Sequence, residues 1–250
     1  MKVICEPRRA YVWLFVFLGK KITGKGVGLM HIPDGFLDVK TWASTGAASA
    51  AVLGWGLKKA GEVLTDKQVP LLGAVSAFIF AAQMVNFPIV GGTSGHLIGG
   101  VLAAVLFGPW AAVIMMSVIL VLQCFIFLDG GITALGANIL NMAVIAPFSG
   151  YYVYCFLKRV LKGRAGKTTA VFTASWFSVV LAAAAASLEL ALSGTAPLGL
   201  TLTAMLIWHS LIGVGEGLIT AAVVKYLERM GIGAGASADF GIGGGEAVEK

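Results

Sequence analysis

The chain has 250 residues, of which 58% are hydrophobic and only 12% are charged. Soluble domains carry about a quarter charged residues, so this composition excludes an ordinary water-soluble domain. The formal net charge is +6. The basic residues stand in short runs between apolar stretches, which is typical of membrane topology and not of nucleic-acid binding. We therefore expect an all-α polytopic membrane protein whose surroundings are the lipid bilayer.

Residues 1–29 differ from the rest of the chain. Three basic residues precede an apolar run, Tyr11–Leu18, that is too short to span a bilayer. This arrangement resembles a signal peptide, although no A-x-A cleavage pattern stands before Met30. Two interpretations come first: a signal-like extension that is removed, or a segment that is not translated because translation starts at Met30. A retained N-terminal segment is the third.

Residues 30–230 are interpreted as one membrane-embedded domain of about seven transmembrane helices, at about 20 residues for each span. The third apolar segment is short and is separated from the fourth by a Gly-Pro helix breaker. It could be a re-entrant piece, which must be enclosed by protein or water. The seven segments run approximately over 42–58, 70–87, 96–108, 109–127, 134–157, 169–192 and 199–225.

Lysine and arginine gather in alternate loops, 58–69 and 158–168, and at the end of the last segment. The positive-inside rule places these basic loops in the cytoplasm. The mature N-terminus then lies outside and the C-terminus inside, with His31 and His96 on the same outer face. The Gly- and Ala-rich residues 231–250 are expected to form a disordered cytoplasmic tail.

The pair Met30-His31 is a candidate chelator. If Met30 is the mature N-terminus, its amine, the amide nitrogen of His31 and the His31 imidazole can close two fused rings on one metal ion. Tetragonal nitrogen sites suit Ni(II) and Cu(II), and Co(II) is plausible. His96, in a glycine-rich segment, is the candidate for the fourth nitrogen. The alternative is that Met-His occurs by chance and that His96 is an interfacial or hydrogen-bonded residue.

Four segments of the chain, in order and at matching spacing, resemble the CbiM/NikM family of substrate-binding (S) components of energy-coupling-factor cobalt and nickel transporters. They are Met30–Leu37, Gly92–Leu97, Leu106–Trp110 and Asp129–Met142. The resemblance covers about residues 30–230. It implies that the metal is held by Met30, His31 and His96. The 29-residue extension departs from the family pattern and puts the starting residue in doubt.

The resemblance also implies a role and partners. The chain would be the metal-capture component of an importer in the prokaryotic cytoplasmic membrane. A transmembrane coupling subunit and separate ATPase subunits would drive it, and a small accessory membrane subunit is a possible further partner. Cobalt, supplied for cobalamin biosynthesis, is favoured over nickel. The metal is the transported substrate, and no cofactor is expected.

Other polar residues lie within or near the apolar segments. Gln83, Asn86, Asn138 and Asn141 could orient the metal-binding segments through hydrogen bonds, or could join helices to one another. His209, Glu216 and Glu189 are functional candidates, but we favour groups satisfied by neighbouring helices. No H-E-x-x-H motif and no paired aspartates stand within the spans, so an enzyme is not expected. A metal-free structural membrane protein is the more remote alternative.

Overall fold

The computed structural model describes residues 31–62, 64–85, 87–89 and 93–231. The predicted extension, Met30, Asn86 and all but the first residue of the predicted tail lie outside these ranges. The interpretations of both chain ends therefore stay predictions.

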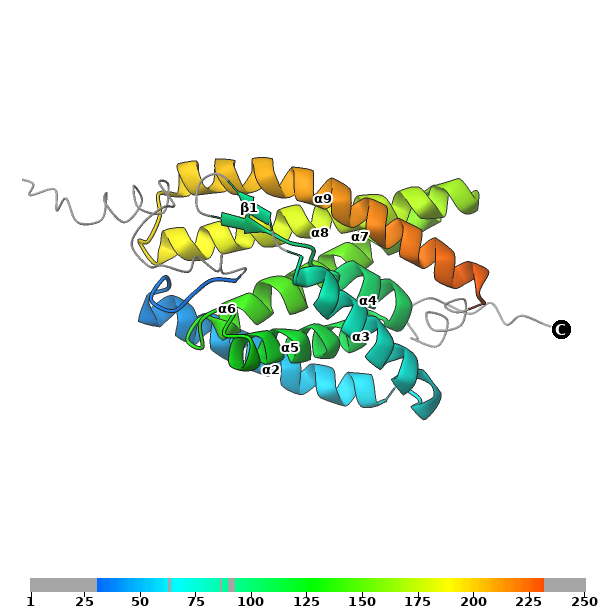
Figure 1. Cartoon of the computed structure of the whole chain (residues 1–250), viewed down its shortest axis with the longest axis horizontal. Coiled ribbons are helices and arrows are strands. Elements are labelled where there is room, and N and C mark those ends of the chain that lie inside the picture. Colours follow the sequence, from blue (N-terminus) through cyan, green and yellow to red (C-terminus); the bar gives the residue numbers. More distant parts are fainter. Residues whose placement is uncertain (1–30, 63, 86, 90–92, 232–250) are drawn as a thin grey trace, which may run out of the picture.

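The described chain is a bundle of helices with one short two-stranded ribbon (Figure 1). Strands β1 (Phe87–Ile89) and β2 (Thr93–Gly95) pair antiparallel. A 3₁₀ turn, η1 (Asp66–Gln68), precedes α3, and a π-helical stretch, η2 (Leu140–Ile145), joins α6 to α7. The α-helices are α2 (Val39–Gly61), α3 (Val69–Gln83), α4 (Gly100–Phe107), α5 (Pro109–Ile126), α6 (Leu135–Ile139), α7 (Ala146–Val160), α8 (Gly163–Leu192) and α9 (Leu198–Arg229).

The prediction of an all-α polytopic membrane protein is confirmed, since each of the seven apolar segments contains a helix. Four helices in the described ranges are long and apolar enough to cross a bilayer by themselves: α5, the continuous stretch from α6 to α7, α8 and α9. Helices α2 and α3 meet the same criterion of length and composition only when taken together as a bent pair.

Helix α4 is the centre of the core. Its eight residues span about 12 Å, which is less than half of a bilayer's hydrocarbon thickness. All eight are buried. Gly108, with φ 84°, and Pro109 then redirect the chain into α5. This third apolar segment is enclosed by protein, as a short piece at membrane depth must be.

Helices α8 and α9 pack closely along their length on one side of the bundle (Figure 1). Gly213 and Gly217 lie against Trp176 and Phe172 of α8, where an added Cβ would come within 2.9 and 2.6 Å of a ring atom. Only 11% of the most apolar window of α9 is buried, so most of this helix faces outward.

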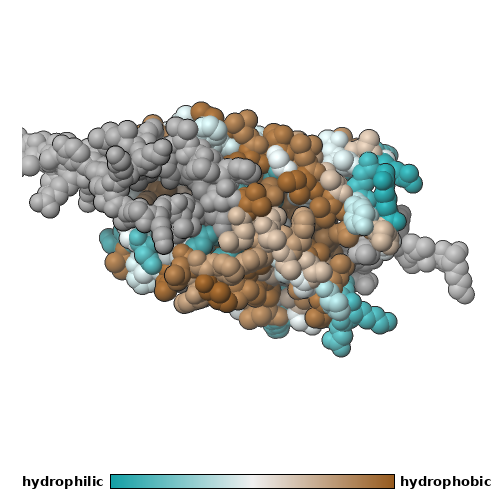
Figure 2. All heavy atoms as spheres, viewed as in Figure 1, coloured by the Kyte–Doolittle hydropathy of each residue, from teal (hydrophilic) through white to brown (hydrophobic). Residues whose placement is uncertain are grey.

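The basic residues gather at one end of the bundle. This end holds the last turns of α2, α7 and α9, with Lys58, Lys158 and Arg229 among their residues. Figure 2 shows hydrophilic residues at this right-hand end and a hydrophobic belt across the middle. The segments that carry His31 and His96 lie towards the opposite end (Figure 1).

Candidate metal-capture site

The first described residues, 31–38, form an arm that lies on the loop between α5 and α6. Asn138 of α6 contacts Ile32 twice: its Oδ1 accepts the Ile32 N–H at 3.1 Å, and its Nδ2 donates to the Ile32 carbonyl at 3.2 Å. The Gly131 N–H donates to the same carbonyl at 2.9 Å. The arm is thus fixed through its backbone directly after His31.

A second set of contacts holds the arm at Asp34. Its carboxylate accepts from the backbone N–H and hydroxyl of Thr133 and from the Ile132 N–H, at 2.6–3.2 Å. The Thr133 hydroxyl and then its backbone N–H hold the pKa of Asp34 below its usual value. Gly131 allows the close approach, because an added Cβ would come within 2.3 Å of the Asp34 nitrogen.

The loop that carries His96, residues 95–99, is held from two sides. Gln83 of α3 donates to the Ile98 carbonyl at 2.6 Å and accepts from Gln123 of α5 at 2.8 Å. On the other side, Glu216 of α9 accepts the N–H groups of Ile98 and Gly99 at 2.8 and 2.7 Å. Three helices therefore set the position of this loop.

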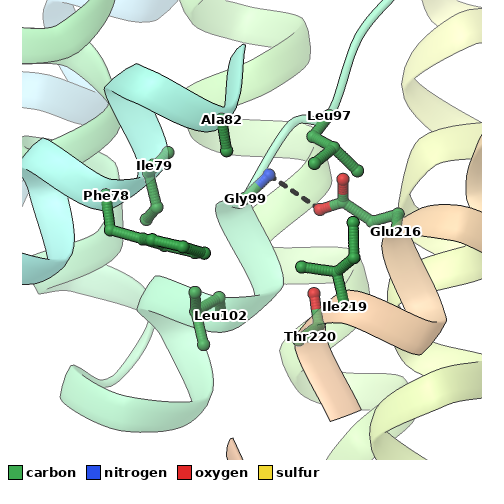
Figure 3. Close-up of a pocket in the computed structure, with 9 residues that line it drawn as sticks. All are labelled: Phe78, Ile79, Ala82, Leu97, Gly99, Leu102, Glu216, Ile219 and Thr220. Carbon is green, nitrogen blue, oxygen red and sulfur yellow. Dashed lines mark hydrogen bonds between the residues drawn. The ribbon is translucent and has the colours of Figure 1, made fainter. Parts of the chain in front are cut away.

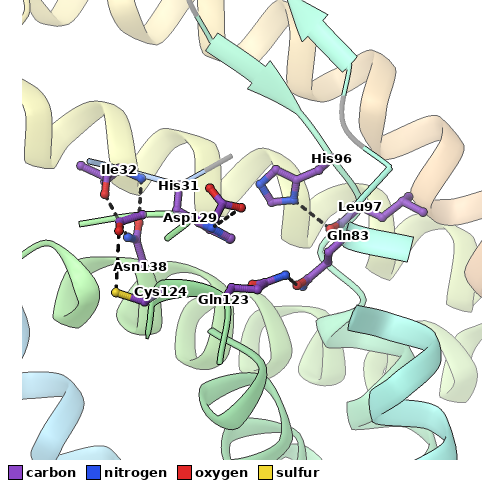
Figure 4. A network of polar contacts seen from close by, with 10 residues as sticks. His31, Ile32, Gln83, His96, Leu97, Gln123, Cys124, Asp129 and Asn138 are labelled. Atoms are coloured by element: carbon purple, nitrogen blue, oxygen red, sulfur yellow. Dashed lines mark hydrogen bonds and ion pairs between the residues drawn. The ribbon is translucent and has the colours of Figure 1, made fainter. Parts of the chain in front are cut away.

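The arm and this loop bring two histidines together. The ring centroids of His31 and His96 are 5.2 Å apart, and the rings are inclined by 60°. Figure 4 shows the two rings with Asp129 beside them, above the amide pair of Gln83 and Gln123. Asp129, just after α5, has its Oδ2 atom 3.4 Å from the Nδ1 atom of His31.

His31 is 6% exposed, and neither ring nitrogen has a hydrogen-bond partner among the described residues. Buried polar groups are hydrogen-bonded in most proteins, so an orphaned imidazole signals an additional partner. Asp129 is close to Nδ1, but their contact lacks hydrogen-bond geometry. A metal ion is a suitable partner, because imidazole is a common ligand of late first-row metals.

The contacts of His96 favour its neutral form. Its Nδ1 atom lies 2.9 Å from the Leu97 carbonyl, which can only accept, so the proton is assigned to Nδ1. In this tautomer Nε2 is the ring nitrogen with a lone pair available for a metal ion. Desolvation, with a smaller effect of His31, lowers the pKa of His96 to about 4, and the ring is neutral at physiological pH.

Side chains alone do not complete a metal site in the described ranges, where no three His, Cys, Asp or Glu residues form a metal-binding group. Two imidazoles and one nearby carboxylate are present there, and a backbone or terminal nitrogen is a candidate for a further donor. Met30, the predicted source of the amine, adjoins the described arm but lies outside the described residues.

The four residues predicted to orient the metal-binding segments do not share one role in the structure. Asn138 contacts the arm and Gln83 contacts the His96 loop, whereas Asn86 lies outside the described residues. Asn141 donates instead to Glu189 of α8 at 2.7 Å, so it joins two helices, the alternative that the sequence had left open. His209 lies near the Met205 carbonyl of its own helix, with Nδ1 at 2.9 Å.

Two residues of the network were missed from the sequence. Gln123 is an amide within an apolar span and could have been found by that criterion alone. Asp129 was noted as the first residue of the segment Asp129–Met142 but was not proposed as part of the site. Its position next to His31 follows from the turn after α5, where Leu128 adopts φ 55° and the Asp129 N–H donates to the Gln123 carbonyl.

Comparison with known proteins gives consistent matches. The family model for the cobalt uptake substrate-specific transmembrane region, CbiM, matches residues 31–232. A putative fused nickel transport protein, NikMN, of Archaeoglobus fulgidus is 47% identical over 79% of this chain, which spans 65% of that protein's length. A putative metal transport protein of Haloquadratum walsbyi is 40% identical over 79% of this chain and 89% of its own. A crystal structure of a truncated transition metal transporter superposes with a TM-score of 0.75 at 38% identity, covering 80% of this chain and 99% of that one.

Proposed function

We propose, since the chain belongs to the CbiM family of cobalt uptake transmembrane regions, that it captures a divalent transition-metal ion for import. Cobalt is the first candidate, because the family description names it. Nickel is the second, because the 47% identical relative is named as a nickel transport protein. Both ions suit a site of nitrogen donors. The observation that carries the proposal is a buried His31 ring that faces His96 and has no hydrogen-bond partner among the residues that the structure describes.

The proposed donors are the Met30 amine, the His31 amide nitrogen after loss of its proton to solvent, Nδ1 of His31, and Nε2 of His96. The amine and the amide nitrogen close a five-membered ring with the metal. The amide nitrogen and Nδ1 close a six-membered ring, which Nε2 could not close. Asp129 lies beside Nδ1, so its negative charge would stand next to the bound cation.

The chain would work as one component of a larger importer in the prokaryotic cytoplasmic membrane. We propose a transmembrane coupling subunit and ATPase subunits as partners, with a small accessory membrane subunit as a further candidate. The basic end of the bundle would face the cytoplasm, and the two histidines would face outward. Cobalt taken up in this way would supply cobalamin biosynthesis.

The test is a titration with Co(II) and Ni(II) of purified protein that starts at Met30. We expect one ion per chain, and we expect His31→Ala and His96→Ala each to weaken binding by at least about 100-fold. The matched control is His209→Ala, which removes the third histidine of the chain. No stoichiometric binding would favour the metal-free structural alternative, whereas binding that survives both substitutions would overturn the assigned donors. Uptake assays with each ion then decide between cobalt and nickel.

A further inference from the structure

Glu216 is a buried carboxylate on a helix that is otherwise mostly outward-facing. It is 1% exposed, and its two oxygens accept the N–H groups of Ile98 and Gly99. These N–H groups stand at the start of α4, where the helix macrodipole favours negative charge. The acceptor of both groups is therefore a side chain from α9, which is more than 100 residues away in the sequence.

The surroundings of this contact differ on its two sides. Figure 3 shows a small hollow below Glu216, between α3, α4 and α9, lined mainly by apolar side chains. On its other side, α9 is packed tightly on α8 through Gly213 and Gly217. The two hydrogen bonds of Glu216 therefore join the α8–α9 pair to the loop that carries His96.

We infer that Glu216 is the positioning residue that fixes His96 opposite His31. Through this contact, the position of α9 is coupled to the metal affinity of the site. Ile98 and Gly99 follow His96 by two and three residues, so release from Glu216 would remove two of the hydrogen bonds that position this loop and leave its contact with Gln83, which is itself bonded to Gln123. A shift of α9 that breaks the two bonds would withdraw one donor while the arm keeps its own contacts at Asn138. The metal readout of this inference rests on the proposed function.

The chain offers a matched control. Glu189 of α8 is also a buried carboxylate, but it accepts from Asn141. We therefore compare Glu216→Gln with Glu189→Gln. A glutamine at 216 keeps the size of the side chain but offers one oxygen acceptor in place of two.

The first measurement is hydrogen exchange of metal-free protein. We expect faster exchange of the Ile98 and Gly99 amides in Glu216→Gln, and wild-type rates there in Glu189→Gln. The second measurement is the affinity for Ni(II) and the rate at which Ni(II) dissociates. We expect Glu216→Gln to bind Ni(II) about tenfold more weakly and to release it about tenfold faster, and we expect wild-type values for Glu189→Gln. In a His96→Ala background the same substitution should have no further effect, because the positioned ligand is absent.

Unchanged exchange at Ile98 and Gly99 would overturn the inference. An equal loss of affinity in the His96→Ala background would also overturn it, because Glu216 would then act on the fold as a whole. If wild-type protein binds no metal, the proposed function fails, and the exchange measurement still tests whether Glu216 holds the loop. Glu216→Ala, with thermal unfolding as a check of the fold, extends the series to complete loss of both bonds.

Discussion

Asn138 holds the backbone of Ile32 with both ends of its side-chain amide, at 3.1 Å to the N–H and 3.2 Å to the carbonyl. This contact follows His31 directly, so it sets the position of His31. We expect Asn138→Ala to weaken Co(II) or Ni(II) binding by about 10- to 100-fold, the usual effect of losing a group that orients a metal ligand. The measurement is a titration of the Met30-start protein.

The control for this prediction is Asn141→Ala. Asn141 is also buried, one helical turn further on, but its amide is bonded to Glu189 and does not contact the arm. It should lower the thermal unfolding temperature without a comparable loss of affinity. Equal affinity losses in the two variants would show that the amide of Asn138 acts through general stability.

Asp129 places a carboxylate oxygen 3.4 Å from the Nδ1 atom of His31. A negative charge at this distance favours a bound cation, most strongly where the surroundings exclude water. We expect Asp129→Asn to weaken divalent metal binding by about tenfold or more at constant pH and ionic strength. Asp66→Asn, which removes an exposed charge before α3, should leave the affinity unchanged. Tighter binding by Asp129→Asn would mean that the carboxylate competes with the metal for His31.

The sequence predicted the helices well because lipid-sized apolar segments are a strong signal. It did not predict that α2 turns polar residues such as Thr41, Thr45 and Ser49 inward, or that α4 is buried on all sides. Both depend on which neighbours cover a helix, and apolar content alone does not encode that. Segment length did indicate that the third piece needed an enclosing environment.

Prediction of the site was partial for a similar reason. His31 and His96 stood out because histidines are few, and their proximity is present in the structure. The residues that orient them were harder to sort: Asn138 and Asn141 have the same chemistry and share a helical region, yet only Asn138 reaches the arm. The π-helical stretch that begins at Leu140 separates the two and alters the direction of the side chains that follow.

The proposed chelate depends on a free amine at Met30. A chain that keeps residues 1–29 has an amide at this position, which lacks the basic lone pair of an amine. We expect the full 250-residue chain to bind Ni(II) at least about 100-fold more weakly than protein that starts at Met30. Isothermal titration of both forms, with intact mass to confirm each start, provides the measurement.

A Met30→Ala variant tests whether the terminal amine, and not the Met30 side chain, is the donor. It is produced with a free N-terminus by cleavage of a tag. It keeps the amine and loses the thioether, so its affinity should stay near that of the wild type. A large loss would show that the Met30 side chain, and not only its amine, takes part in the site. Tight binding by the full chain would require a different set of donors.

Helices α2 and α6 meet at two glycines, and this contact supports the helix that carries Asn138. A Cβ added at Gly136 would lie 2.4 Å from the Gly46 Cα atom, and the Ser49 hydroxyl donates to the Gly136 carbonyl at 2.6 Å. Because backbone atoms cannot move aside as a side-chain end can, we expect Gly136→Ala to destabilise the protein by about 1–3 kcal/mol. It should also displace Asn138 and weaken metal binding.

Gly54→Ala is the matched control on α2, since a Cβ there has nothing within 4 Å and alanine is the better helix former, by up to about 1 kcal/mol. Thermal unfolding in detergent should therefore move in opposite directions for the two variants, and a Gly136→Ala protein as stable as the wild type would contradict the close contact of α2 with α6.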